Sequence, residues 1–184
     1  EDGCRSFVDQ AVAALGGCDI LVNNVGGMVP GTLDSLTPEQ WKEAIDRNLM
    51  SYIHTTKFTI PYLKKSQAGR ILNVSGISGT MLFPGALSTT LPNTAIIGFS
   101  KLMANDLAPF NILVNNICPG TIDVESWGPR AERMAKARGK TAEEVRGTLA
   151  GMAMLNRLGR PEEVGSLAAF LVSGKNSYMT GTTV

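Results

Sequence analysis

The chain has 184 residues, of which 43% are hydrophobic, and its 17 basic and 16 acidic side chains leave a net charge of +1. This length and apolar content suit one compact domain over residues 1–184. The even mixture of charges favours neither nucleic acid nor an anionic membrane as a partner. The three cysteines lie far apart without CxxC spacing, which argues against a disulfide framework or zinc site and predicts a reducing, cytoplasmic compartment. No apolar run is long enough to span a membrane, and the acidic start is unlike a signal peptide.

Short β-branched runs alternate along the chain with longer helical patterns, which predicts a mostly parallel sheet with helices on both faces, a doubly wound α/β fold. We expect strands at residues 20–22, 70–74 and 111–114, and the beginning of a last strand at 178–184. Helices are expected around 7–15 and at 37–53, 95–107 and 160–171, with a helical region at 132–154 broken near 139–141. A different α/β module of three or four strands is the alternative.

Two helix starts carry distinct signals. Thr37, Pro38 and Gln40 supply a cap, a proline at the first helical position and the glutamine of a capping box. Pro92 also favours the first turn of a helix. The helix that contains it is therefore expected to begin near Leu91, with Thr89 or Thr90 as its cap.

Four sequence features together resemble the short-chain dehydrogenase/reductase family, and in particular the reductases that act on 3-oxoacyl carrier proteins. They are CDILVNNVGG at 18–27, Asn48, GRILNVSG at 69–76 and VNNICPG at 114–120. The resemblance covers nearly the whole chain and implies a Rossmann-like fold, NAD or NADP as cofactor, and a small alcohol or carbonyl substrate. It also implies a homodimer or homotetramer, assembled through the helices around Asn48 and around 95–107.

By the same resemblance, two segments bind the cofactor: the loop after the first strand and the Pro-Gly turn after the third. The residues concerned are Asn23, Asn24, Val25, Gly26, Pro119, Gly120, Thr121 and Ile122. The alternative for the first loop is an ordinary turn, because asparagine and glycine favour turns. Val124 stands where the family usually has a threonine, which would remove one hydroxyl contact to the cofactor.

The catalytic positions depart from the family pattern of a serine, a tyrosine and a lysine four residues beyond the tyrosine. Those positions read Gly76, Thr89 and Asn93 here. An aliphatic hydroxyl is a far weaker acid than a phenol, and an asparagine brings no charge to strengthen it. Ser75 and Asn48 remain the candidate catalytic residues, although Asn48 could simply bind a carbonyl of its own helix. Ser78 is the alternative to Ser75 as the residue that reaches a substrate carbonyl. The sequence therefore predicts either an NAD(P)-dependent oxidoreductase or a non-catalytic protein that binds cofactor, ligand or partner subunits.

The family's glycine-rich phosphate turn has no counterpart before Asp19. From this and the short last strand, we expect the sequence to lack the N-terminal βαβ part of the fold and the end of the last strand. Cys118 is expected to be a small core residue, and His54 a surface or interface residue.

The segment 123–160 corresponds by resemblance to a lid over the substrate. Its apolar residues are consistent with an apolar pocket or with core contacts of amphipathic helices. They are Trp127, Met134, Met152, Met154 and Leu155.

Overall fold

The computed structural model describes residues 1–83, 85–125 and 127–184. The chain divides into two compact units. The first comprises residues 1–118 and 170–184, and the second comprises residues 119–169.

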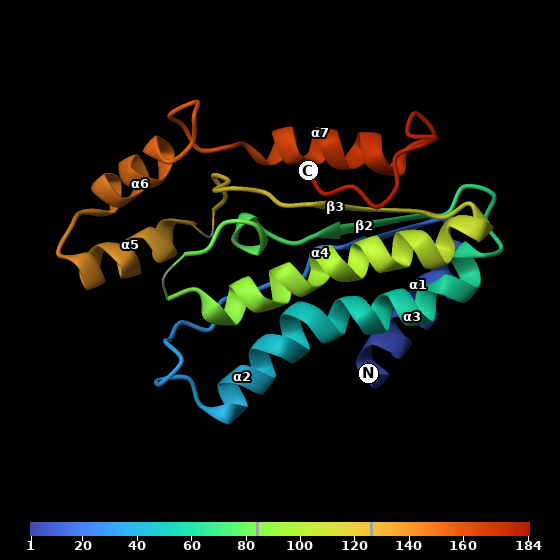
Figure 1. The fold of residues 1–184 in the computed structure, drawn as a ribbon, viewed down its shortest axis with the longest axis horizontal. Helices are drawn as coiled ribbons and strands as arrows, with labels where there is room; N and C mark the ends of the chain where they lie inside the picture. The colour runs from blue at the N-terminus through green and yellow to red at the C-terminus, as the bar shows by residue number, and fades with distance from the viewer. Residues whose placement is uncertain (84, 126) are drawn as a thin grey trace. The chain divides into compact units, whose positions relative to one another are not determined.

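A three-stranded parallel sheet forms the centre of the first unit (Figure 1). Its strands lie in the order β1 (Ile20–Asn23), β2 (Arg70–Val74) and β3 (Leu113–Ile117). The first two strands confirm the prediction. The third begins two residues later than expected, because Asn111 ends a 3₁₀ turn in the left-handed conformation, with φ of 55°.

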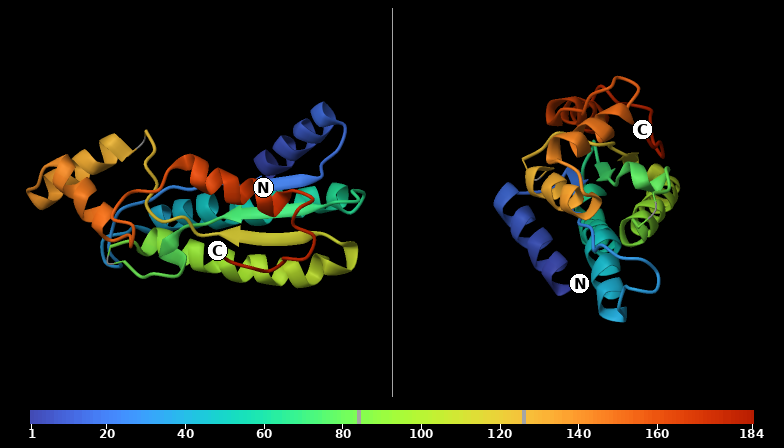
Figure 2. Two further views of the ribbon diagram at one scale, coloured as in Figure 1. Left: turned by 90° about the horizontal axis from the view of Figure 1, so that it is seen from above. Right: turned by 90° about the vertical axis from the view of Figure 1, so that its left-hand side faces the viewer.

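Helices α3 and α4 pack against one face of this sheet, and α1 packs against α3, as Figure 1 and the views in Figure 2 show. Apolar side chains from the sheet and from α3 and α4 form the core there: Leu63, Ile71, Ala104, Leu107 and Val114 are all buried. The helical elements of this unit are α1 (Asp2–Leu15), α2 (Pro38–Ile45), η1 (Asp46–Met50), α3 (Ser51–Leu63), η2 (Ile77–Gly79), α4 (Leu87–Leu107) and η3 (Ala108–Phe110).

The predicted helix start at Thr37 is confirmed. The Thr37 hydroxyl accepts a hydrogen bond from the Gln40 backbone, and the Gln40 side chain accepts one from the Thr37 backbone, which completes the capping box. The helix then continues through the π-helical turn η1 into α3. Such turns are rare and often mark functional sites, and this one contains Asn48.

The expected start of the next helix is wrong. Helix α4 begins at Leu87 with Ala86 as its cap, so Thr89 and Thr90 lie inside its first turn and neither side chain caps it. Pro92 sits within the helix and is buried. A proline there leaves the carbonyl of Ser88 without its usual helical donor. Ser88 is itself buried, and its hydroxyl donates to the Val29 carbonyl, so tertiary contacts hold the extra turn in place.

The last strand predicted at 178–184 is reduced to an isolated bridge, although the C-terminal residues do run beside β3. The backbone of Asn116 bonds to Thr182 at 2.9 Å and to Val184 at 3.1 Å, and Asn116 forms a parallel bridge with Thr183. This segment continues the parallel order of the sheet.

The second unit contains α5 (Trp127–Arg138), α6 (Ala142–Gly151) and most of α7 (Pro161–Val172). The predicted break between the first two helices is confirmed at Gly139, which has φ of 61°. Thr141 and Glu144 form a capping box at the start of α6. Helices α5 and α6 pack against each other.

Candidate functional site

The carboxyl ends of β1, β2 and β3 lie at one edge of the sheet because all three strands are parallel. Asn23, Asn73 and Asn116 are in register across the three strands and form one row near this edge. All three are at least 95% buried. In open α/β sheets, ligands bind outside this edge, so the loops that follow the row are the candidate site.

The side chain of Asn23 bonds inside the protein and does not face this edge. Its amide nitrogen donates to Asn73 Oδ1 at 2.9 Å and to Thr56 Oγ1 at 3.2 Å, while its oxygen accepts from Thr55 Oγ1 at 2.7 Å. Asn73 in turn donates to Ser100 Oγ at 2.8 Å. The row thus joins β1 and β2 to helices α3 and α4.

Asn24, Val25 and Gly26 form an exposed loop after β1. Two side chains from the helix behind it hold its backbone. The Tyr52 hydroxyl lies 3.0 Å from the Val25 carbonyl oxygen and 2.7 Å from that of Val74, so it connects the ends of β1 and β2. The loop is therefore fixed from below while its outer surface stays open.

Asn48 supplies the second support. Its oxygen accepts from the Gly27 backbone N–H at 2.7 Å, and its nitrogen donates to the carbonyls of Gly27 and Ala44, both at 2.9 Å. Arg47 packs so closely on Gly27 that an added Cβ there would lie 2.8 Å from its guanidinium carbon. Because an amide has two N–H groups, both donors of Asn48 are used by the backbone. Position 48 acts here as a clamp on the loop.

Among the described residues, no other tyrosine replaces the catalytic tyrosine of the family, whose position reads Thr89. The chain has three tyrosines, and Tyr52 is the one beside this edge. Burial raises the pKa of Tyr52 to about 12, whereas a proton donor for neutral pH needs a lowered pKa. Tyr62 lies 14 residues beyond Asn48 in the same helical run, about 20 Å away at the rise of a helix, and Tyr178 is 93% exposed.

Lys101 does not replace the missing lysine either. It is exposed and lies two helical turns beyond Asn93 on α4. Its side chain passes the backbone of Gly181, where an added Cβ would be 3.0 Å from its nitrogen. Asn93 therefore receives no cation from its own helix.

Ser75 lies at the end of β2, next to the end of β3. Its hydroxyl is 3.1 Å from the Cys118 sulfur and accepts from the Asn116 amide at 3.0 Å. The Asn116 nitrogen also lies 3.2 Å from the same sulfur. Ser75 and Cys118 are each half-buried, so Cys118 is less enclosed than the core position expected for it.

Gly76, Ser78 and Asn93 meet between η2 and α4. An ideal Cβ built on Gly76 would lie 2.9 Å from Asn93 Nδ2, and that nitrogen donates to Ser78 Oγ at 2.8 Å. The structure therefore brings two of the three substituted positions into direct contact. Thr89, four residues before Asn93 on the same helix face, keeps a buried hydroxyl with no hydrogen-bond partner among the described residues.

The Pro-Gly turn belongs to the second unit. Within it, Gly159 N–H donates to the Thr121 carbonyl at 3.0 Å and Asp123 N–H donates to the Gly159 carbonyl at 2.7 Å. This parallel bridge pairs Ile122 with Gly159 without using the N–H or C=O of Ile122 itself. The backbone groups of Ile122 are consequently not engaged by the bridge.

The apolar residues expected in the lid differ in how far their side chains are exposed. Met152, Met154 and Leu155 are exposed, with Met154 fully so, whereas Met134 is half-buried. The side chain of Trp127 lies outside the described residues. The exposed residues follow α6 and do not form core contacts.

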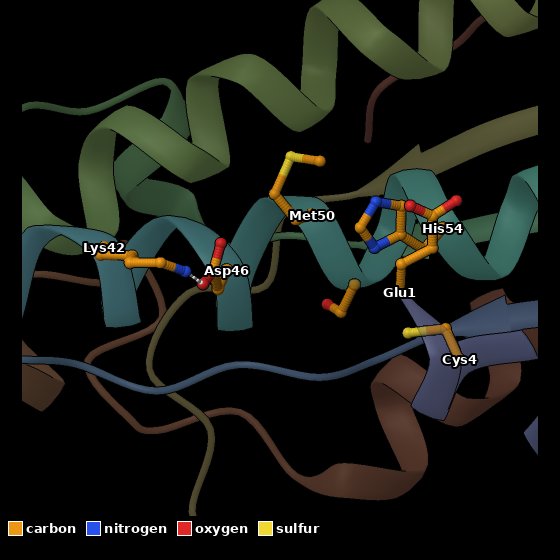
Figure 3. Close-up of a pocket in the computed structure, with 7 residues that line it drawn as sticks. Glu1, Cys4, Lys42, Asp46, Met50 and His54 are labelled. Carbon is orange, nitrogen blue, oxygen red and sulfur yellow. Dashed lines mark hydrogen bonds and ion pairs between the residues drawn. The ribbon is translucent and has the colours of Figure 1, made fainter.

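A separate pocket of about 360 Å³ lies between the start of α1 and the α2–α3 run (Figure 3). His54 lines it, half-buried, together with Cys4 and Met50. The Lys42–Asp46 ion pair forms one side of it, as Figure 3 shows. Within residues 1–83, 85–125 and 127–184, no group of three or more His, Cys, Asp or Glu side chains could hold a metal ion.

The role of Tyr52 is not predicted from the sequence, although Tyr52 lies four residues after Asn48 and so shares its helix face. Ser78 is a predicted candidate for reaching a carbonyl, and the structure adds its contact with Asn93. In the part of the chain that the structure describes, no helix is long and apolar enough to cross a membrane.

Comparisons with known proteins agree with this arrangement. A family model described as enoyl-(acyl carrier protein) reductase matches residues 1–184. The 3-oxoacyl-[acyl-carrier-protein] reductase FabG of Thermotoga maritima is 33% identical over 183 residues, which are 100% of this chain and 70% of the relative. The oxidoreductase UcpA of Salmonella typhimurium is 37% identical over 180 residues, which cover 97% of this chain and 67% of the relative. The chain thus spans about two thirds of the length of these curated relatives.

Two solved structures share the fold. The ligand-free aldohexose dehydrogenase of Thermoplasma acidophilum has a TM-score of 0.92 at 31% identity and covers 100% of this chain and 71% of its own. The L-sorbose reductase of Gluconobacter frateurii, in complex with NADPH and L-sorbose, has a TM-score of 0.92 at 26% identity and covers 99% and 70%. With its Rossmann-like sheet, its Asn-Asn-Val-Gly loop and its Pro-Gly turn, the chain belongs to the short-chain dehydrogenase/reductase family, among the members similar to 3-oxoacyl-acyl-carrier-protein reductases.

Proposed function

We propose that this chain is part of an NAD(P)-dependent oxidoreductase that binds a small alcohol or carbonyl compound, and that its turnover is slow because the family's proton donor has been replaced. Membership in the family and the NADPH-bound relative support the nicotinamide cofactor. The support within the molecule is the edge of the sheet, where a loop with an open outer surface is fixed in place by buried side chains.

The residues present fit a nicotinamide dinucleotide. Asn24, Val25 and Gly26 offer an exposed surface after β1, which suits the flat adenine ring of the cofactor. Asn23 holds this strand in position from the interior. In the second unit, Pro119, Gly120 and Thr121 lead to Ile122, whose N–H and C=O are not used by the bridge to Gly159. These backbone groups match what a carboxamide needs, which is one donor and one acceptor. When bound, the cofactor supplies or accepts the hydride.

Proton transfer limits the reaction. The position that the family gives to a tyrosine carries Thr89, and the lysine position carries Asn93. Removal of a positioned general acid typically costs about 10²–10⁴-fold in rate. Ser75 and Asn48 do not fill the gap in the geometry seen here, because each already bonds to neighbouring protein groups.

One observation favours a second candidate function, a non-catalytic binding protein. Asn93 takes the space of a side chain on Gly76 and bonds to Ser78, so the substituted residues fit one another. If the catalytic side chains had simply been lost, the residues that replace them would not need to fit one another in this way. The proposal of slow turnover rests instead on Thr89, which stands in the place of the family's proton donor.

The test begins with fluorescence titrations of NADH and NADPH on the purified chain, followed by turnover assays on a panel of small ketones. The Thr89→Tyr/Asn93→Lys variant is compared with the parent, and Gly76→Ser is added as a third change because Asn93 no longer fills that space. Cofactor binding with weak parental turnover that rises at least tenfold in the triple variant supports the oxidoreductase. Cofactor binding with no turnover in the parent supports the binding protein. Absence of cofactor binding in the parent contradicts the oxidoreductase, and it restricts the binding protein to a ligand or a partner subunit.

We further propose that the protein forms a homodimer or homotetramer through α3 and α4. Leu91 and Leu102 on α4 are 50% and 62% exposed, which leaves apolar surface on that helix. Light scattering of the eluted protein gives its mass directly, and a monomer at high protein concentration would contradict this assembly.

A further inference from the structure

Gly76 is not required by the backbone. Its φ of −169° and ψ of 158° are extended values that any residue adopts. What a side chain at this position would meet is Asn93, whose Nδ2 would lie 2.9 Å from a Cβ there. The Asn93 amide therefore lies beside the space that a serine side chain at position 76 would enter.

The Asn93 amide is oriented by one bond and keeps one donor free. Nδ2 carries two N–H groups, and the bond to Ser78 Oγ at 2.8 Å uses one of them. No second acceptor for Asn93 Nδ2 is found among residues 1–83, 85–125 and 127–184. Asn93 is only 9% exposed, so its orientation is set by the protein and not by solvent.

Thr89 adds a second unused group on the same helix face. Several hydroxyls in the long helices bond back to a carbonyl four residues earlier, as Thr94 does to Thr90 at 2.9 Å. Thr90, next to Thr89, is another buried hydroxyl without a partner among the described residues. The Thr89 hydroxyl makes no such bond and is buried. Buried polar groups normally have partners, so a ligand that bonds to this hydroxyl removes a standing cost.

We propose that Asn93 binds the carbonyl oxygen of a small uncharged ligand through its free amide N–H, in place of the family's serine, and that Ser78 is the positioning residue that orients the amide. This inference rests on the proposed function, because it concerns the carbonyl compound of the same site. Asparagine side chains donate to the oxygen of a reacting carbonyl in other enzymes, where they stabilise the negative charge that develops on it. Gly76, Ser78, Thr89 and Asn93 are all uncharged, so the contact favours a neutral carbonyl over a carboxylate, whose desolvation they would not offset.

The experiment follows the carbonyl group itself. Ethyl acetoacetate labelled with ¹³C at its ketone is bound to the full chain at saturating oxidised cofactor, which prevents reduction. Its dissociation constant is measured by NMR, and its carbonyl stretch by difference infrared spectroscopy. A hydrogen bond from Asn93 lowers the stretching frequency below that of the unbound ester.

The variants are Asn93→Leu, which removes the amide donor, and Ser78→Ala, which removes the hydroxyl that orients this amide. In Asn93→Leu the frequency should return toward the unbound value, and the dissociation constant should rise about tenfold. Ser78→Ala should broaden the carbonyl band because the amide then samples several orientations. Thr94→Val is the matched control: it also removes a link between α4 and η2, the 3.2 Å bond to the Gly79 carbonyl, and should leave the carbonyl band unchanged.

Circular dichroism checks that each variant folds. Asn93→Asp replaces Asn93→Leu where the latter does not fold, because it keeps the size of the side chain and removes both amide donors. Cofactor binding without ester binding, or ester binding with the same carbonyl band in the parent and in these variants, overturns the role of Asn93 and leaves the proposed function standing. Failure of the parent to bind NADH or NADPH overturns the proposed function.

Discussion

Asn48 and Gly27 are joined by a pair of hydrogen bonds, in which the amide of Asn48 accepts at 2.7 Å and donates at 2.9 Å to the same backbone residue. The Asn48 side chain thus pairs with both backbone groups of one residue, as the backbone of a neighbouring strand does in a sheet. The pair ties the loop after β1 to the π-helical turn η1, 21 residues further along the chain.

Loss of this pair should destabilise the protein. Asn48→Ala should lower the free energy of unfolding by about 2–4 kcal/mol, because it leaves the N–H and C=O of Gly27 without partners. Urea denaturation measures the loss. The exposed Asn24→Ala, in the same loop, should change stability by less than about 0.5 kcal/mol. Equal effects of the two changes would contradict the clamp.

Tyr52 predicts a dependence of stability on pH. Burial raises the pKa of its phenol from 10.0 to about 12. The folded protein therefore holds this proton more tightly than the unfolded chain does. The contribution of Tyr52 to stability is complete below pH 10 and should be lost as the pH rises from 10 towards 12.

Urea denaturation at several alkaline pH values tests this, with Tyr52→Phe as the comparison. The variant should be less stable than the parent near pH 8 by about 1 kcal/mol, since it loses the bonds to Val25 and Val74. Its stability should fall less steeply above pH 10. Parallel pH profiles for the two proteins would show that Tyr52 is not the titrating group.

Gly76 and Asn93 should be coupled in stability. Gly76→Ala places a methyl group 2.9 Å from Asn93 Nδ2, so the Asn93 amide must shift and weaken its bond to Ser78, which should cost about 1 kcal/mol. In an Asn93→Ala background the space is empty, and the same change should cost much less. A double-mutant cycle from urea denaturation gives the coupling energy.

Gly98→Ala is the control for this cycle. Gly98 lies in α4 with nothing within 4 Å of an added Cβ, so alanine there should stabilise the helix by up to about 1 kcal/mol. Additive effects of the changes at 76 and 93 would mean that the two residues do not share space.

Glu163 at the start of α7 should titrate at unusually low pH. Hydrogen bonds from Arg157 and from the Arg160 backbone, with the charge of Arg157, lower its pKa to about 2. The stability it contributes is present above its ordinary pKa of 4.5 and should be lost as the pH falls from there towards 2. A carboxyl ¹³C titration by NMR measures this, and Arg157→Gln should bring the pKa back towards its ordinary value.

The sequence alone determined the strands β1 and β2, the capped start of α2 and the break before α6. These depend on neighbours a few residues apart: β-branched runs, a Thr-Pro-x-Gln box, and Gly139 followed by Thr141. The family also followed from short motifs that need no contact across the fold. Because local interactions specify such features, the pattern of residues was enough.

Only the tertiary structure decided where α4 begins and how the substituted positions relate. Local rules place Pro92 in a first turn, but burial of Ser88 and Thr90 holds a further turn before it. Likewise, the fit of Asn93 to Gly76 joins residues 17 positions apart. Side-chain amides and hydroxyls bond to whatever groups folding brings within about 3 Å. Such contacts cannot be predicted from the separation of the two residues along the chain.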